Sequence, residues 1–250
     1  MKRSPRSRRA PTGISLRRTG RGWRLSQHGT VLSEVLAEPG PTHSVFDVLA
    51  ALAGMDPHVR DVALLGFGGG GMVAALRALG CRATIHAVDL DDTGYALLRR
   101  HRASWLHPLV WHQADAVGWL ENAGLFDLVI DDLSVPKSGD VEKPDATWET
   151  LPELVAGHLR PGGRAVFNLL CRRGWSWERC LARVRTARTD VARWVGFRDF
   201  ENRVVVCDGP VGTSIDTTGQ GTRRFGTALR RLLGALGSRQ RRRIQVRSLH

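Results

Sequence analysis

The sequence predicts an α/β protein with a Rossmann-like, doubly wound and mostly parallel sheet. Three observations predict this fold class. Apolar runs of strand length alternate with helical repeats between residues 62 and 170. The first run opens directly into a glycine-rich loop. Acidic residues follow the ends of several runs. Alternation of strands and helices is typical of a parallel sheet that is covered by helices.

Residues ahead of the first of these strands predict a small hairpin and a helix. Residues 22–35 (GWRLSQHGTVLSEV) alternate loosely between polar and apolar, which indicates a β-hairpin and a candidate flap on the substrate side. Apolar residues at helical spacing predict a helix over 44–53, which Thr42 or Ser44 could cap. We therefore assign residues 22–60 to an N-terminal hairpin and helix.

The stretch over residues 62–92 has the order strand, glycine loop, helix, strand, acid. An apolar run over 62–65 leads into a glycine loop, and a helical repeat follows over 72–79. A second apolar run over 83–88 ends at Asp89. Glycines let a ligand approach the free N–H groups at the helix N-terminus, and a carboxylate at the next strand tip can accept both hydroxyls of a ribose. This order predicts a nucleoside-cofactor site.

Acids also follow the next two predicted strands. Asp115 comes shortly after the strand over 109–111, and Asp131 and Asp132 follow the strand over 126–130. Ligands of open parallel sheets lie outside the carboxyl ends of the strands, so acids that recur there indicate one crevice. Adjacent side chains at a strand end face opposite ways, which leaves open which of Asp131 and Asp132 points into the crevice.

The rest of the chain completes this pattern. A polar loop over 134–148 is long for a compact domain, and we expect it to act as a lid. The same periodicities predict helices over 93–102, 117–121, 151–160 and 175–187, strands over 164–170, 191–195 and 203–207, and a short apolar helix over 228–236.

The net charge of +13 is concentrated at the two ends of the chain. Residues 1–24 carry nine Lys and Arg and no acid, and residues 223–250 carry nine more and no acid, which leaves −5 for residues 25–222. Such ends are typical of solvated, disordered arms, and we assign residues 1–21 and 211–250 to basic tails. The charge of these tails is also compatible with a weak contact with RNA, DNA or an anionic membrane surface, although no aromatic side chain that could stack on bases is interleaved with the arginines.

Other classes of protein are not supported. No apolar run approaches the ~18 residues that a membrane span needs, and no apolar secretory segment follows the basic N-terminal arm. We therefore expect a soluble, cytoplasmic protein. The four cysteines form no CxxC pair and the nine histidines contain no HExxH, so we expect no metal site.

Taken together, these residues resemble the class I AdoMet-dependent methyltransferase fold. Within it, residues 126–136 (FDLVIDDLSVP) are similar to the signature region of polyamine aminopropyltransferases, the spermidine synthase-like branch. The resemblance extends over roughly residues 25–208, and it makes residues 61–210 an AdoMet-fold catalytic domain.

The resemblance implies a binding role for several residues. Gly66, Gly68 and Gly70 would line the methionine side of S-adenosylmethionine (AdoMet) or of its decarboxylated form. Asp89 would hold the ribose hydroxyls, and Asp115 would hold the adenine amino group.

The resemblance also implies the catalytic residues. Asp132 falls on the first catalytic Asp of the family, with Asp131 beside it. Val135 stands where that family has a second, substrate-binding Asp. The chain has one tyrosine, Tyr95, whereas that family places several tyrosines around a diamine. We therefore expect methyl transfer from AdoMet slightly ahead of aminopropyl transfer from decarboxylated AdoMet, with a small-molecule acceptor.

Two other functions fit part of the sequence. A nicotinamide-dependent oxidoreductase also uses GxGxxG followed by an acid, although Asp115 and the Asp131–Asp132 pair argue against it. A catalytically silent ligand-binding or RNA-associated module fits the basic ends and the missing second Asp. The sequence leaves a homodimer open.

Overall fold

The N-terminal part of the chain forms a separate three-stranded antiparallel sheet. In this computed structural model, which describes residues 14–27, 30–101, 103–137, 140–185, 190–209 and 219–248, strands β1 (Ile14–Thr19), β2 (Gly22–Gln27) and β3 (Thr30–Leu36) follow one another as a meander. The expected hairpin is thus extended by β1, whose residues we had assigned to a disordered tail. Exposed arginines suit an edge strand, because charged side chains block further pairing.

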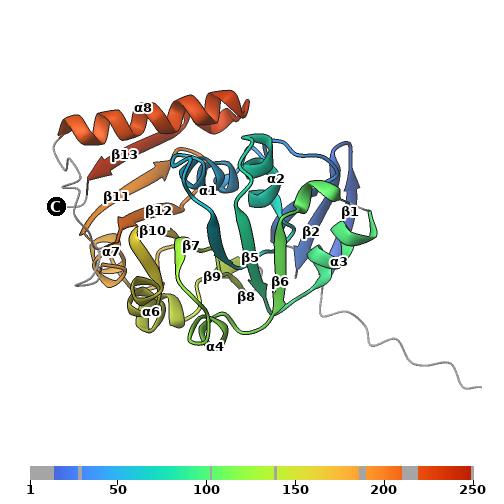
Figure 1. Cartoon of the computed structure of the whole chain (residues 1–250), viewed down its shortest axis with the longest axis horizontal. Coiled ribbons are helices and arrows are strands. Elements are labelled where there is room, and N and C mark those ends of the chain that lie inside the picture. The colour runs from blue at the N-terminus through green and yellow to red at the C-terminus, as the bar shows by residue number, and fades with distance from the viewer. Residues whose placement is uncertain are drawn as a thin grey trace, which may run out of the picture.

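The main sheet has eight strands in the order β13-β11-β12-β10-β7-β4-β5-β6 (Figure 1). Five of them are parallel: β4 (Asp61–Leu65), β5 (Thr84–Asp89), β6 (Leu109–Gln113), β7 (Phe126–Asp131) and β10 (Leu159–Leu169). β11 (Asp190–Phe197), β12 (Arg203–Asp208) and β13 (Ile244–Ser248) pair antiparallel. This arrangement confirms the predicted fold class. The strand order reverses at β4, next to β7, and this is where ligands of such sheets bind.

Helices cover both faces of the sheet. On one face, α1 (Val45–Ala53), α2 (Gly71–Ala78) and α3 (Thr93–Arg100) share a core with the strands, and the 3₁₀ turn η1 (Ser104–Leu106) adds to it. On the other face lie α4 (Ala116–Leu120), α5 (Ala146–Glu149), α6 (Leu151–Gly157) and α7 (Trp177–Arg183). Successive residues of β4 alternate between the two cores, because strand side chains point to opposite faces.

The C-terminal segment is not the disordered tail that we expected from residue 211 on. Residues 219–248 form α8 (Gly219–Ala235), the 3₁₀ turn η2 (Arg239–Arg242) and β13, which extends the sheet beside β11 (Figure 1). Phe225, Leu229 and Leu233 recur every four residues and are buried against the core that contains α1. This apolar stripe supplies the burial that orders an arginine-rich segment.

Candidate functional site

A cavity of about 800 Å³ lies at the carboxyl ends of the parallel strands. The residues that follow β4, β5, β6, β7 and β10 line it. The predicted lid contributes Ser134, Val135, Val141, Pro144 and Ala146. Residues of β2 and β3, the start of α1, and the loop between β11 and β12 also line the cavity. The predicted flap therefore contributes to the cavity, and the volume lies within the range of small-molecule sites.

The glycine loop connects β4 to α2 and forms one side of the cavity. Gly66 and Gly68 line the cavity and have positive φ angles of 90° and 53°. A Cβ on Gly66 would lie 2.7 Å from the carbonyl oxygen of Asp132, so only glycine allows β4 and β7 to approach this closely. Gly70, at the start of α2, packs behind the loop against Phe67 rather than lining the cavity.

Asp89 ends β5 and organises this loop. Its Oδ2 accepts hydrogen bonds from the backbone N–H groups of Phe67 (2.8 Å) and Gly68 (2.9 Å). Its Oδ1 accepts one from Asp91 N–H (3.1 Å). Because Asp89 also lines the cavity, the same carboxylate fixes the loop and presents acceptor sites to a ligand.

Asp115 follows β6 and caps α4. Its Oδ2 accepts a hydrogen bond from Gly118 N–H at 2.9 Å, which leaves the other oxygen for a ligand. Apolar side chains share this part of the lining: Leu90, 70% exposed, and Val117. An acceptor flanked by apolar groups suits a flat heterocycle with an amino group.

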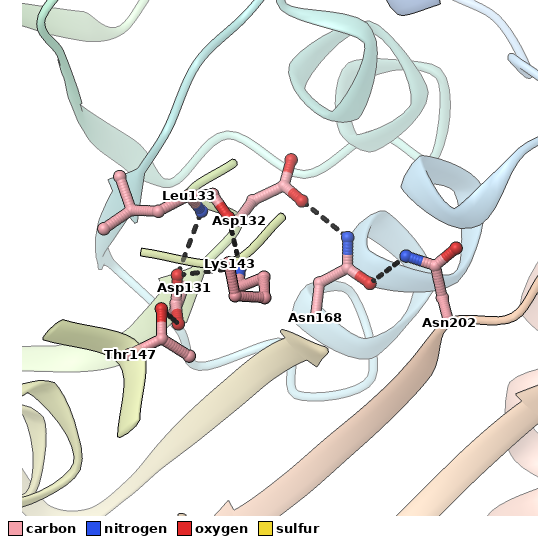
Figure 2. Close-up of polar contacts among 7 residues, drawn as sticks. All are labelled: Asp131, Asp132, Leu133, Lys143, Thr147, Asn168 and Asn202. Carbon is pink, nitrogen blue, oxygen red and sulfur yellow. Dashed lines mark hydrogen bonds and ion pairs between the residues drawn. The ribbon is translucent and has the colours of Figure 1, made fainter. Parts of the chain in front are cut away.

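Asp131 and Asp132 point in opposite directions at the end of β7 (Figure 2). Asp131 is buried, and its carboxylate accepts hydrogen bonds from the Thr147 hydroxyl (3.0 Å) and from Leu133 N–H (2.9 Å). It also forms a buried ion pair with Lys143 at 3.2 Å. Asp131 does not line the cavity; it holds the segment that follows the β8 (Val135–Lys137) and β9 (Asp140–Glu142) hairpin of the predicted lid.

Asp132 does line the cavity and lies at the end of a chain of amides. Its Oδ1 accepts a hydrogen bond from Asn168 Nδ2 at 2.7 Å, and Asn168 Oδ1 accepts one from Asn202 Nδ2 at 3.0 Å (Figure 2). Burial raises the pKa of Asp132 to about 7, against the opposing effects of Lys143 and the Asn168 hydrogen bond. Asp132 is therefore able to take up and release a proton near neutral pH.

Sequence reasoning missed three polar residues of this region. Lys143 lies in a polar loop among other charged residues and carries no local signal. Asn168 offers a signal, because it is the one polar side chain in the apolar run over 165–170. Asn202 joins it only through the pairing of β10 with β12.

The N-terminal sheet brings the other charged pair of the cavity wall. Arg24 of β2 and Glu34 of β3 lie opposite each other and form an ion pair at 3.6 Å. The Nε of Arg24 is buried without a hydrogen-bond partner among the described residues. An unpaired N–H here is a potential donor to an anionic ligand group.

The strand order and the residues at the ends of the strands define the fold. A doubly wound sheet with a glycine loop at the switch point, and acids after the neighbouring strands, is the class I AdoMet-dependent methyltransferase fold. Solved structures with this fold include the spermidine synthase-like branch expected from the sequence.

A probable spermidine synthase from Corynebacterium glutamicum has a TM-score of 0.64 and 16% identity, over 94% of this chain and 86% of that one. The spermidine synthase from Thermotoga maritima has a TM-score of 0.59 and 14% identity, over 85% and 74% of the two chains. Human methyltransferase-like protein 13, in complex with SAH, has a TM-score of 0.57 and 20% identity, over 75% and 90%. No protein-family model and no curated protein matches the chain.

Within the part of the chain that the structure describes, no three His, Cys, Asp or Glu side chains come together as a metal site. None of the helices in that part combines the length and the hydrophobicity of a membrane span.

Proposed function

We propose that the chain is a group transferase of the spermidine synthase-like branch that transfers a methyl group from AdoMet. The observation that carries the proposal is the order of groups around one cavity. Asp115, Asp89, the glycine loop and Asp132 follow the ends of β6, β5, β4 and β7, which are consecutive in the sheet. A ligand lying along this edge first meets a carboxylate that can accept a hydrogen bond from adenine and then one that can accept hydrogen bonds from ribose. It next meets the glycine loop and a titratable acid.

The chain's own residues fit AdoMet at the nucleoside end. Asp89 supports ribose binding, because its carboxylate can accept further hydrogen bonds besides those from the backbone N–H groups of the glycine loop. Gly66 and Gly68 support close contact with the methionine side, since their Cα atoms line the cavity without a side chain. The solved structures of similar fold include one with SAH and one with the transition-state analogue AdoDATO, a spermidine synthase with a TM-score of 0.59 and 13% identity.

AdoMet supplies an electrophilic carbon next to a sulfonium, so the protein's task is to align the acceptor and to exclude water. Asp132 orients the acceptor and accepts its proton. Its pKa of about 7 makes it a better match to a neutral acceptor than an ordinary carboxylate. Asn168 positions this side chain by its hydrogen bond to Oδ1.

Two features support AdoMet over its decarboxylated form. Val135, 42% exposed, is part of the lining where the aminopropyltransferase family has a second acid for the far end of a diamine. Arg24 brings a guanidinium to the wall, and its unpartnered Nε suits a carboxylate, which decarboxylated AdoMet lacks. Aminopropyl transfer remains the second candidate because of the FDLVIDDLSVP segment.

Isothermal titration calorimetry of the full chain with AdoMet, decarboxylated AdoMet, methylthioadenosine and NAD tests the proposal. Tighter binding of AdoMet than of the decarboxylated form is expected, and Arg24→Gln should reduce that preference. Tighter binding of decarboxylated AdoMet would favour aminopropyl transfer as the function instead. Binding of NAD alone would overturn the assignment, and binding of none of the four would favour a catalytically silent module.

A pair of variants tests the catalytic assignment. Asp132→Asn should bind AdoMet with nearly the parent affinity and lose turnover. Ser134→Ala serves as its matched control, since Ser134 lines the same cavity two residues away and has no role in the proposed chemistry. Parent-like turnover in Asp132→Asn would refute the role given to this carboxyl group.

A further inference from the structure

The C-terminal segment presents an extended cationic surface. Residues 219–248 hold nine arginines and no Asp or Glu, and all nine are exposed. Eight of them form what we call the arginine surface: Arg223, Arg224, Arg230, Arg231, Arg239, Arg241, Arg242 and Arg243. Arg247 lies on the other face of the sheet, over the Trp194 ring. An open hollow on the outer side of α8 is lined by Arg223, Arg224 and Arg231.

The fold holds this surface rigidly. The stripe of α8 that includes Phe225 and Leu229 is buried in the main core, and β13 pairs with β11 at five consecutive positions. Its arginines therefore lie on an ordered helix and turn rather than on a free tail.

The arginine surface lies next to the rim of the cavity. In η2, the Gln240 side chain donates to the backbone carbonyl of His43 at 2.9 Å, between the lining residues Thr42 and Ser44. Just after η2, Arg243 forms an ion pair with Asp199, which precedes the lining residue Phe200. Two separate parts of the cavity rim, at residues 43 and 199, are thus held by η2 and the residue that follows it. The turn η2 also carries Arg239, Arg241 and Arg242.

The chemistry of the surface indicates its partner. The arginines of α8 extend over about 12 Å, from Arg223 to Arg231, and those of η2 lie beyond its C-terminal end. A single small anion therefore cannot contact all of these charges. The exposed large apolar side chains of the described residues all lie outside 219–248, so the surface has nothing to insert into a lipid layer. Residues 25–222 carry a net charge of −5. A long polyanion is therefore attracted to this surface and repelled by the rest of the domain.

We propose that the arginine surface binds the sugar–phosphate backbone of a nucleic acid and holds it beside the rim of the cavity. The contact is electrostatic and independent of base sequence, since the arginines are the residues that contact phosphates. This binding goes beyond the proposed transferase activity and does not depend on it.

The test is fluorescence anisotropy of the full chain with labelled 20-nucleotide RNA and DNA, single- and double-stranded, over a series of salt concentrations. The first variant replaces four arginines of α8 by Gln: Arg223, Arg224, Arg230 and Arg231. Its control removes four exposed arginines elsewhere, and hence the same net charge: Arg60, Arg82, Arg100 and Arg173. Because Arg and Gln have similar helix propensities, the fold should be retained, which circular dichroism checks.

Each lost phosphate contact lowers the slope of log K against log salt by about 0.7 to 0.9. The α8 variant should therefore lose about 3 from the slope, and on the order of 100-fold in affinity at low salt, while the control stays close to the parent. Replacement of the same four residues by Lys keeps the charge and should retain binding. Comparison of the affinities for RNA and DNA shows which nucleic acid binds more tightly.

Three results would overturn the proposal. These are absence of binding by the parent at 50 mM salt, an equal loss in the α8 variant and the control, and binding of the parent to anionic phosphatidylserine vesicles but to no nucleic acid. AdoMet calorimetry separates this proposal from the transferase activity. A parent protein that binds AdoMet but no nucleic acid refutes the arginine surface alone.

Discussion

Replacement of Asp132 by Asn should stabilise the protein at alkaline pH while it removes turnover. The side chain keeps its shape, and its Oδ1 can still accept the hydrogen bond that Asn168 donates at 2.7 Å. Only the negative charge is lost. The variant therefore isolates the effect of holding a carboxylate in this partly buried position.

The sign follows from the raised pKa of Asp132, which is about 7 in the folded protein against an ordinary value of 3.8. The folded state binds this proton more tightly than the unfolded state, so the stability of the parent falls as pH rises from about 4 to about 7. At 1.36 kcal/mol per pH unit, the limit is ~4 kcal/mol. Because Asp132 opens onto the cavity, solvent screening reduces the expected effect to ~1–2 kcal/mol.

Urea unfolding followed by circular dichroism between pH 4.5 and pH 8.5 measures this difference. Parent and variant should be similar in stability at about pH 4.5, and the variant should be ~1–2 kcal/mol more stable at about pH 8.5. Asp131→Asn is the matched control, since it weakens the buried ion pair with Lys143 and should be less stable than the parent across this range. An identical pH dependence in Asp132→Asn and the parent would refute the reasoning.

Four other outcomes are expected. Asp89→Ala should weaken AdoMet binding about 100-fold in calorimetry, because two hydrogen bonds to a charged group are worth ~3 kcal/mol; an unchanged affinity would remove Asp89 from the site. Gly94→Ala places a Cβ 1.9 Å from the Gly68 carbonyl oxygen and should cost ~2–3 kcal/mol in urea unfolding. Lys143→Met leaves a buried carboxylate unpaired and should lower the unfolding free energy by ~3–5 kcal/mol, with near-parent stability as the contrary result. Turnover should rise with pH through about 7, as Asp132 ionises, and a flat profile between pH 6 and pH 8 would contradict its role.

Much of the fold could be predicted because its signals are local. The apolar runs that became β4 to β7 and the glycine loop after β4 are each readable within a few residues. The clustering of acids can be predicted in the same way, since the carboxyl ends of parallel strands all lie at one edge of the sheet. This local logic placed Asp89, Asp115 and Asp132 around one cavity.

The rest depended on tertiary structure. The direction of Asp131 and Asp132 follows from which face of β7 meets α5, and the spacing of residues does not determine this. The contact between Asn168 and Asn202 joins residues 34 positions apart through the pairing of β10 with β12. In α8, the many arginines obscured a four-residue apolar repeat, so composition suggested disorder where burial produces order. A fragment that ends near residue 212 would therefore lose an edge strand and part of the core.

The link between α1 and η2 also bears on how the chain folds during synthesis. Asp47, fully buried in α1, accepts a hydrogen bond from the Ser238 hydroxyl, 191 residues further along the chain. While the ribosome is still making the second half of the sheet, α1 therefore has no cover on this side. Contacts of such long sequence separation form late and slowly. During synthesis, this side of α1 therefore stays uncovered until α8 and η2 have been made.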